Sequence, residues 1–176
     1  MSQKALSMYE ASVPQFQKML SNADKWLESA IAYAQKKSFD PNVLVNARLA
    51  PDQYPLVKQV QSFCDNAKFA CARLAGKDPP AHPDTEQTMD ELRARLRTCL
   101  GYLETFKPAD FDGAETRSIE LSFLEGKTMT GTDYLLEMVV PNFYFHVVTA
   151  YSILRHNGVD LGKMNYIGSL KLHDKK

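Results

Sequence analysis

The sequence has 176 residues and no formal net charge, because 21 lysine and arginine residues balance 21 aspartate and glutamate residues. This balance excludes a strongly basic nucleic-acid-binding protein and a polybasic membrane-surface protein, which both need excess positive charge. The hydrophobic fraction of 44% and the charged fraction of 24% are ordinary for a globular chain. We therefore expect residues 1–176 to form a single domain, with a disordered tail at about 171–176.

The compartment is inferred from apolar runs and cysteines. No apolar run approaches the roughly 20 residues of a membrane span, and the first residues do not resemble a signal peptide. Cys64, Cys71 and Cys99 form an odd, small set that is not typical of a disulfide framework. We expect a cytoplasmic protein with buried, reduced cysteines and with neither a membrane nor a nucleic acid as partner.

Apolar residues recur at alternating spacings of three and four in four segments of the chain. Such spacing places all members of a set on one face of a helix. Four amphipathic helices bury their apolar faces most simply by packing together, so the pattern predicts an all-α four-helix bundle. The four segments are residues 13–34, 56–74, 89–106 and 143–154.

The ends of the first two helices are predicted from proline, glycine and capping residues. Asp40 followed by Pro41 ends the first helix and begins a short turn. The second helix is expected to start around residues 51–52 and to end at Gly76, a typical C-terminal cap. Residues 78–83, which contain three prolines, then form a stiff crossover.

The second half of the chain begins with a third helix, which we expect to be capped by Asp84 or Thr85 and to fade at 106–108. Within residues 108–131, apolar residues alternate with polar ones at a strand period, which indicates a small β-hairpin turning at 125–127. The fourth helix has a lead-in over 132–139 and ends at 156–158. The alternating apolar residues are Ile119, Leu121 and Phe123.

The histidines are the first candidates for chemistry, because phosphate-loop, CxxC, HExxH and nucleophile-elbow motifs are absent from the sequence. His82 and His173 lie in a loop and in the tail, where we expect solvated side chains. His146 and His156 are ten residues apart, about 15 Å along a helix, so they cannot bind one metal ion. For His146 three interpretations stay open: a buried hydrogen-bonded residue, a ligand-binding or catalytic residue, and a metal ligand.

Other polar residues lie close to His146 on the predicted helices. Asn142 precedes His146 by one turn, and Gln59 flanks the buried face of the second helix. Their oxygens are poor zinc ligands, and the Asp65 carboxylate falls opposite that buried face. We therefore expect no metal and no cofactor.

Further ligand-binding candidates flank the second and fourth helices. A guanidinium group matches carboxylates and phosphates with two parallel hydrogen bonds, although a local cap or a helix-dipole contact accounts equally for each arginine. A tyrosine among the aromatic residues of the fourth helix either packs in the core or lines a pocket. These candidates are Arg48, Asp52, Arg155 and Tyr144.

Two blocks of sequence carry a family resemblance. The first runs from Arg48 through Gln59 to Gly76, and the second runs from Pro141 through His146 to Gly158. Both resemble the DUF1993 family, which is placed in the DinB/YfiT-like superfamily. The resemblance implies a four-helix bundle with a long crossover.

The superfamily resemblance also implies where a metal would bind. Many DinB-like proteins carry three histidine ligands, and some of them use the metal in thiol-dependent transfer or isomerisation. By this resemblance, His146 falls on one ligand position, Asn142 falls on a second, and the third falls near residues 59–62. Because only one of the three is histidine, the resemblance does not carry over a metal-dependent activity.

Three functions remain open at this point. The first is a small-molecule-binding bundle, with His146 as the catalytic residue of a metal-independent enzyme. The second is a non-catalytic module that forms a homodimer through exposed apolar residues such as Trp26, Tyr33 and Phe39. The third is a cryptic metal-dependent enzyme of the DinB type, which recruits Asp65 or a loop residue to His146.

Overall fold

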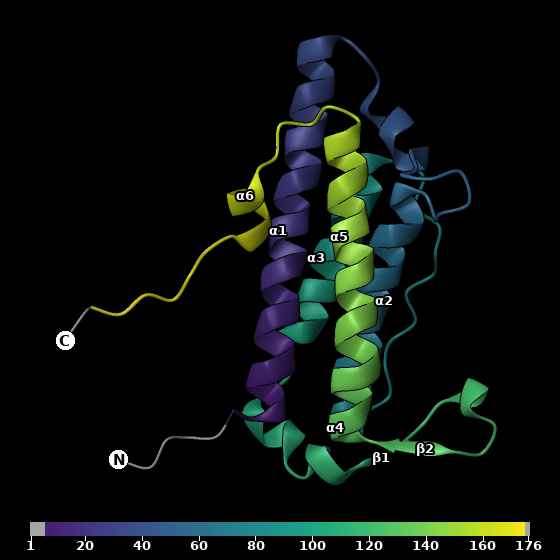
Figure 1. Ribbon diagram of the computed structural model, residues 1–176, viewed down its shortest axis with the longest axis vertical. Coiled ribbons are helices and arrows are strands. Elements are labelled where there is room, and N and C mark those ends of the chain that lie inside the picture. The colour runs from purple at the N-terminus through teal and green to yellow at the C-terminus, as the bar shows by residue number, and fades with distance from the viewer. Residues whose placement is uncertain (1–5, 175–176) are drawn as a thin grey trace.

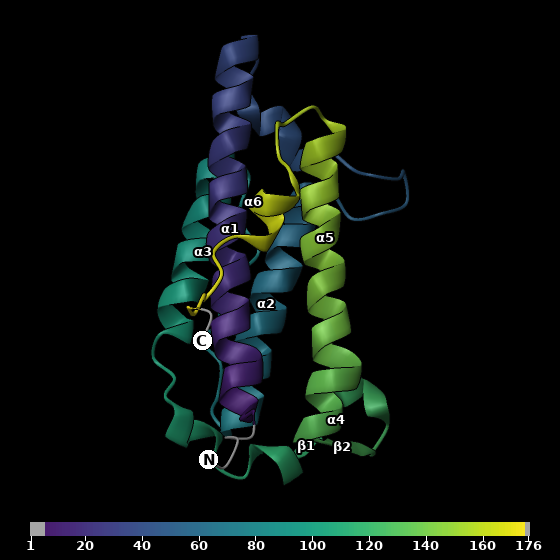
Figure 2. The same ribbon diagram turned by 60° about the vertical axis from the view of Figure 1, so that its left-hand side comes forward.

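Four long helices lie side by side in the computed structural model, which describes residues 6–174 (Figure 1). Helices α1 and α5 run in one direction, and α2 and α3 run in the other (Figures 1 and 2). A long crossover returns the chain from the end of α2 to the start of α3, so the predicted all-α bundle is confirmed. The long helices are α1 (Met8–Lys37), α2 (Leu56–Ala75), α3 (Met89–Leu103) and α5 (Val140–His156).

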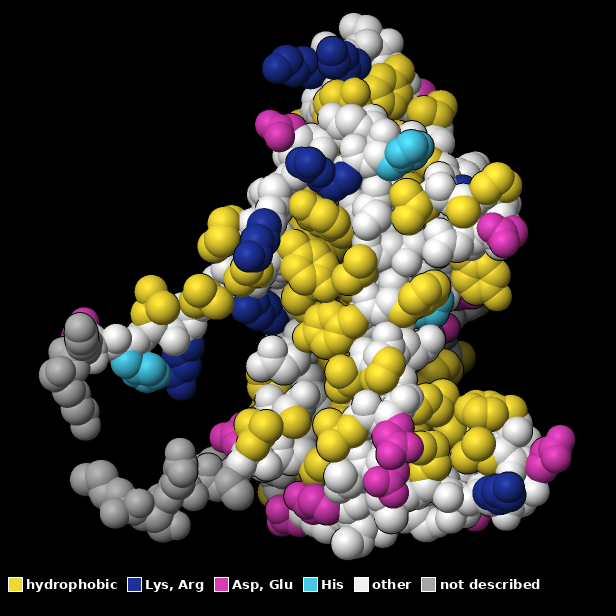
Figure 3. All heavy atoms as spheres, viewed as in Figure 1, with side chains coloured by type: hydrophobic (Ala, Val, Ile, Leu, Met, Phe, Trp, Pro, Cys, Tyr) yellow, Lys and Arg dark blue, Asp and Glu magenta, His cyan; other side chains and the backbone are white. Residues whose placement is uncertain are grey.

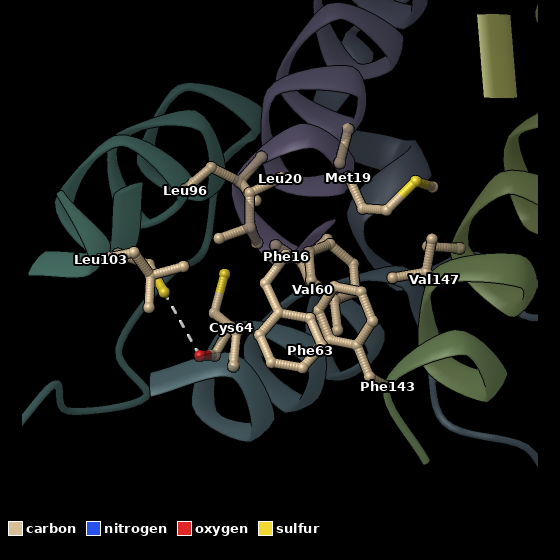
Figure 4. Close-up of a cluster of buried hydrophobic side chains, with 14 of the residues drawn as sticks. Phe16, Met19, Leu20, Val60, Phe63, Cys64, Leu96, Leu103, Phe143 and Val147 are labelled. Carbon is tan, nitrogen blue, oxygen red and sulfur yellow. Dashed lines mark hydrogen bonds between the residues drawn. The ribbon is translucent and has the colours of Figure 1, made fainter. Parts of the chain in front are cut away.

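The core forms where the predicted apolar faces meet. Phe16 of α1, Phe63 of α2 and Phe143 of α5 are fully buried and pack ring against ring (Figure 4). The centroids of the Phe16 and Phe143 rings are 4.6 Å apart, and those of Phe63 and Phe143 are 6.2 Å apart. Every helix of the bundle except α3 contributes to this aromatic centre, and α3 adds Leu96 and Leu103 beside it.

Two predicted helix starts are wrong by about four residues. Helix α2 begins at Leu56, because Pro55 is its N-cap and residues 51–53 form a turn instead. Helix α3 begins at Met89, where the Thr88 hydroxyl accepts from the Glu91 amide at 3.2 Å. The Glu91 carboxylate accepts from the Thr88 amide in return at 2.9 Å, so this capping box replaces the predicted cap at Asp84 or Thr85.

Other predicted boundaries are confirmed. Asp40 caps the 3-10 helix η1 (Pro41–Asn46), with its carboxylate 2.9 Å from the amide nitrogen of Asn42. Gly76 closes α2 with a φ of 64°, a conformation in which glycine avoids the steric penalty of a Cβ atom. At the other end of the chain, Gly158 follows α5 with a φ of 89°.

Between α3 and α5 the chain forms 3-10 turns and a hairpin at one end of the bundle. After η2 (Pro108–Phe111) and η3 (Ala114–Thr116), strand β1 (Ser118–Glu120) pairs with β2 (Thr128–Thr130) in antiparallel register. The predicted hairpin is therefore confirmed, although it is short. Phe123 does not extend β1, since it lies exposed in the 3-10 helix η4 (Ser122–Leu124).

The lead-in to α5 is helical throughout. The single turn α4 (Gly131–Asp133) passes into a π-helix, η5 (Tyr134–Val139), which joins α5 directly at Val140. Pro141 is the second residue of α5 and directly follows the π-helical segment, so the helical hydrogen bond that its N–H would donate is missing within a continuous helix. The Tyr134 hydroxyl is buried and accepts from Arg73 Nη1 of α2 at 3.0 Å, which fixes the π-helical segment against the bundle.

The C-terminal helix α6 (Lys163–Ile167) corrects the prediction for Trp26. Trp26 of α1 is 1% exposed, because it is covered by α6. Figure 2 shows α6 lying next to α1. The indole Nε1 of Trp26 donates to the Asn165 carbonyl at 2.9 Å, and its ring stacks on Tyr166 at 5.6 Å. Residues 171–174 have neither helix nor strand, and the rest of the predicted tail, 175–176, lies outside the described residues.

The cysteines are buried and free, as predicted. The Cys99 thiol lies 3.3 Å from the Cys64 carbonyl oxygen (Figure 4). Burial raises the pKa of the Cys64 and Cys71 thiols, so both stay protonated and unreactive near neutral pH. Among the described helices, none has the length and apolar character that crossing a membrane requires.

A matched pair of glycine substitutions tests the packing of the hairpin end. A Cβ atom at Gly131 would lie 1.8 Å from the Ala114 carbonyl oxygen, whereas a Cβ at Gly101, in α3, would meet nothing within 4 Å. We expect Gly131→Ala to destabilise the fold by about 1–3 kcal/mol through overpacking. Gly101→Ala should stabilise it by about 0.5–1 kcal/mol, because it lowers the entropy of the unfolded chain. Urea denaturation measures both, and equal effects would contradict this packing.

Candidate functional site

His146 and Gln59 are brought together at the contact between α5 and α2. Gln59 lies in the first turn of α2 and is fully buried, as predicted from its position beside the apolar face. Its Nε2 donates to the Tyr54 carbonyl at 3.0 Å, and its Oε1 lies 2.7 Å from His146 Nδ1. Since the Gln59 oxygen can only accept, the imidazole carries its proton on Nδ1 and presents a lone pair on Nε2.

The environment of the His146 ring keeps it neutral. The ring is half-buried, and this burial lowers the pKa of His146 from its ordinary value near 6.5. The exposed Phe145 ring stands edge-on to it, with 5.2 Å between the centroids. His146 Nε2 makes no hydrogen bond among the described residues, and it is not one of their buried unpaired atoms. This nitrogen is therefore open to solvent and available as an acceptor.

The two remaining candidates on α5 differ in their surroundings. Asn142 is exposed one turn before His146, and no hydrogen bond joins its side chain to the described part of the chain. Tyr144 is half-buried, with its ring edge-on to Phe143 at 5.3 Å. Burial raises the pKa of Tyr144, so its hydroxyl remains protonated. Tyr144 packs against the core rather than beside the imidazole.

The charged candidates have local partners. Arg48 Nη1 donates to the Gln53 carbonyl across the turn before α2, and Asp52 is exposed within that turn. Arg155 Nη1 donates to the Leu161 carbonyl after the end of α5. Within residues 6–174, none of these three forms a hydrogen bond or ion pair with His146 or Gln59. The geometry thus brings together His146 and Gln59 from the predicted set, and it leaves the three charged residues apart.

A buried polar cluster on the opposite side of α2 was missed by sequence reasoning. Arg95 of α3 is 4% exposed, although it lies within a run of charged residues on that helix. Its Nη2 lies 2.8 Å from Asp65 Oδ1, and its Nη1 lies 3.0 Å from Glu86 Oε1. Lys68 is 2% exposed and approaches the same Asp65 oxygen at 2.8 Å. The three-residue spacing of Asp65 and Lys68, which places both on one helix face, was the available signal.

This cluster corrects the proposed recruitment of Asp65 to His146. Asp65 does lie on the side of α2 that is turned away from its apolar face, as predicted. The face that carries Asp65 is nevertheless covered, because α3 and the crossover pack on it. The Asp65 carboxylate is occupied by Arg95 and Lys68, and within residues 6–174 it forms no hydrogen bond or ion pair with the imidazole of His146.

His82 also differs from its prediction as a solvated residue. It is half-buried within the crossover, and its Nδ1 is one of the described buried atoms that lack a hydrogen-bond partner. Burial lowers the pKa of His82, and the charges of Lys68 and Arg95 lower it further. Two cavities of about 300 and 480 Å³ flank His82, on the α3 and α2 sides respectively. His146 lines neither of them, nor any of three further hollows on the described surface.

The residues around His146 do not fit a metal ion. Within residues 6–174 there is no group of three or more histidine, cysteine, aspartate or glutamate side chains placed to hold one. The neighbours of His146 are the amide of Gln59 and the ring of Phe145. Zinc sites use imidazole, thiolate and carboxylate ligands, so this donor set is unsuited to zinc.

Comparison with known proteins agrees with the geometry of the fold. The sequence model of the family described as "Domain of unknown function (DUF1993)" matches residues 8–167. A crystal structure of a DinB family member protein from Shewanella denitrificans superposes with a TM-score of 0.92. It is 45% identical in sequence, and the match covers 96% of each chain. The search of curated proteins found no match.

The Gln59–His146 contact predicts how the imidazole titrates. Because the pKa of His146 is lowered in the folded chain, the unfolded chain takes up the proton first as the pH falls below about 6.5. Wild-type stability should therefore decrease over that range. A carboxylate at position 59 would favour the imidazolium, so Gln59→Glu should raise the pKa of His146 by about 1 or more.

NMR titration of the His146 ring resonances measures this pKa directly. Gln35→Glu, on an exposed part of α1, makes the same change of charge far from the contact and should leave the pKa of His146 unchanged. An equal response in both variants would show that the hydrogen bond between Gln59 and His146 does not control the ring.

Proposed function

Because the chain belongs to the DUF1993 family and shares its fold with a DinB family member, we propose that it is a small-molecule-binding bundle whose ligand contacts His146. The observation that carries this proposal is the hydrogen bond between buried Gln59 and His146 Nδ1 at 2.7 Å. It sets the imidazole in one tautomer and orients Nε2 away from the bundle.

Burying the amide of Gln59 costs free energy unless the amide is hydrogen-bonded. An unpaired amide in the interior costs about 1–3 kcal/mol, so a buried glutamine needs partners for both ends of its side chain. Tyr54 provides a carbonyl for the Gln59 nitrogen, and His146 provides an N–H for its oxygen. An apolar residue in place of Gln59 would fill the same space without this requirement. The presence of this costly buried pair therefore supports a role for the orientation of the imidazole.

His146 Nε2 is suited to accept a hydrogen bond or a proton. A neutral imidazole accepts a hydrogen bond and, as a general base, removes a proton from a group within about 2.6–3.2 Å. Lowering of the pKa by burial keeps His146 in this form at neutral pH. With an amide and a phenyl ring as neighbours, the imidazole has no charged partner in its immediate contacts. The site is suited to a ligand that donates a hydrogen bond, such as a hydroxyl or an amide N–H.

The contributions of the other predicted residues are unequal in this proposal. Gln59 acts as a positioning residue, since it reaches the ligand only through the imidazole. Asn142, exposed one turn before His146, borders the ligand in the proposal, whereas Tyr144 contributes to the packing of the core. Arg48, Asp52 and Arg155 contribute local structure through the contacts described above.

A homodimer is a second candidate function, and exposed apolar residues favour it. Hydrophobic side chains gather along the seam between α1 and α5, beside α6, on the face drawn in Figure 3. Phe145 and Val148 of α5 are 53% and 45% exposed, and Met164 of α6 is 63% exposed. Exposed apolar groups of this kind are typical of contact surfaces. Tyr33 and Phe39, predicted for this role, are half-buried and pack edge-on against each other instead.

Sedimentation velocity separates the two candidates. A dimer that persists at micromolar concentration and is lost in Val148→Glu would support the interaction module, whereas a monomer would remove it.

We also propose a cytoplasmic location. It is supported by the three free cysteines, which are typical of a reducing compartment.

Ligand binding at His146 is tested with a small-molecule extract of cells as the probe. We expect the extract to shift the His146 Nε2 resonance and to raise the melting temperature of the wild type, since ligands that bind the native state stabilise it. His146→Gln should abolish the thermal shift. His156→Gln, which changes an exposed histidine on the same helix, should retain it. An unmoved His146 resonance, or an equal thermal shift in both variants, would contradict the proposal.

A further inference from the structure

A cavity lies between α2 and the crossover, on the side of α2 that faces away from His146. Residues 78–83 of the crossover, here called the proline strap, belong to the connection that Figure 1 shows running alongside α2. The cavity has a volume of about 480 Å³, which is within the range of small-molecule sites. Its lining residues are Asp65, Lys68, Phe69, Pro79, Pro80, Ala81, His82 and Pro83.

The walls of this cavity are apolar and offer few hydrogen-bond donors. Pro79, Pro80 and Pro83 have no backbone N–H, so the strap presents rings where another loop would present donors. Phe69 adds a half-buried aromatic ring from α2. A ligand in this cavity must therefore have an apolar body, and the side chains of Lys68 and His82 supply the donors for its polar end.

The ammonium group of Lys68 can donate further hydrogen bonds beyond its contact with Asp65. The Lys68 side chain is 2% exposed, and its ammonium group carries three protons. One carboxylate oxygen, Asp65 Oδ1, lies 2.8 Å from Lys68 Nζ and 2.8 Å from Arg95 Nη2. Asp65 is the carboxylate that pairs with Lys68, and Lys68 shares it with Arg95, which also pairs with Asp84 and Glu86. The Phe69 ring, whose centroid is 4.4 Å from Nζ, is the other contact of the ammonium group.

His82 provides the second polar group, and it lacks a partner. Its Nδ1 is buried and has no hydrogen-bond partner among the described residues, so it can accept a hydrogen bond from a bound molecule or donate one to it. The charged groups that act on the ring are Lys68 and Asp65 of α2, Arg95 of α3, and Glu86 at the end of the crossover. Of these, the two cations and burial lower the pKa of His82, and the two carboxylates raise it.

We propose that the cavity under the proline strap binds a small organic carboxylate with an apolar body. The carboxylate accepts hydrogen bonds from Lys68 Nζ and from His82 Nδ1. The apolar body packs against Phe69 and the proline rings. This site is separate from His146, and it does not depend on the proposed function of that residue.

Charge balance gives the proposal a measurable consequence. The six ionised groups of the cluster already cancel, and the bound carboxylate adds one negative charge beside a neutral imidazole. His82 then takes up a proton from solvent, so binding strengthens as the pH falls toward 6. The six groups are Lys58, Lys68, Arg95, Asp65, Asp84 and Glu86.

Titration calorimetry with benzoate tests the site in the full chain. Benzamide has the same shape without the charge, so it should bind about tenfold or more weakly than benzoate. The affinity for benzoate should fall about 3- to 10-fold between pH 6 and pH 8, with proton uptake detected by changing the buffer. Equal binding of benzoate and benzamide would overturn the proposal.

Variants locate the binding within the cavity. His82→Gln should weaken benzoate binding and remove its pH dependence, and Lys68→Met should abolish binding. Should Lys68→Met fail to fold, the His82→Gln result decides, because His82 lies in the strap outside the helices. His146→Gln should bind benzoate like the wild type, so the two proposed sites fail or succeed separately. Unchanged binding and pH dependence in His82→Gln would overturn the proposal.

Discussion

The constraint on which this structure depends is that α2 is packed on two sides and buries polar side chains there that need partners. Toward α5 it buries the amide of Gln59, and toward α3 it buries the ammonium of Lys68. The interior cannot hold either group without hydrogen bonds or an opposite charge. The two candidate sites of this bundle, at His146 and at Lys68, result from the way those partners are supplied.

The two sides of α2 solve this problem differently. Gln59 is neutral, and its partners are a backbone carbonyl and the imidazole of His146, so no charge is buried there. Lys68 is charged, and its partner Asp65 is shared with Arg95, which in turn reaches acidic groups near the crossover. A buried ion pair offsets its desolvation cost only when hydrogen bonds satisfy the remaining protons and lone pairs. The charged side is therefore the one that retains unmet polar groups.

The sequence predicted the helices well because their apolar faces repeat over many residues. The stripe from Val13 to Ala34 lies in one helix, and its members are buried. Helix starts were less accurate, because several polar residues before α3 are acceptable caps. The pair Thr88 and Glu91 has the spacing of a capping box and identifies the true start. Trp26 was misplaced for another reason, since α6, which buries it, is distant in sequence and too short to show a period.

The polar sites were harder to predict, because they depend on which helices are neighbours. Gln59 was recognised beside an apolar stripe, but its bond to His146 requires α2 to lie against α5. Arg95 sits within a run of charges that reads as a solvated face, and only the crossover above it creates a buried guanidinium. A polar residue at the edge of an apolar stripe therefore has two fates. It reaches solvent where the neighbouring element ends, and it acquires a hydrogen-bond or ionic partner where a strap or a helix covers it.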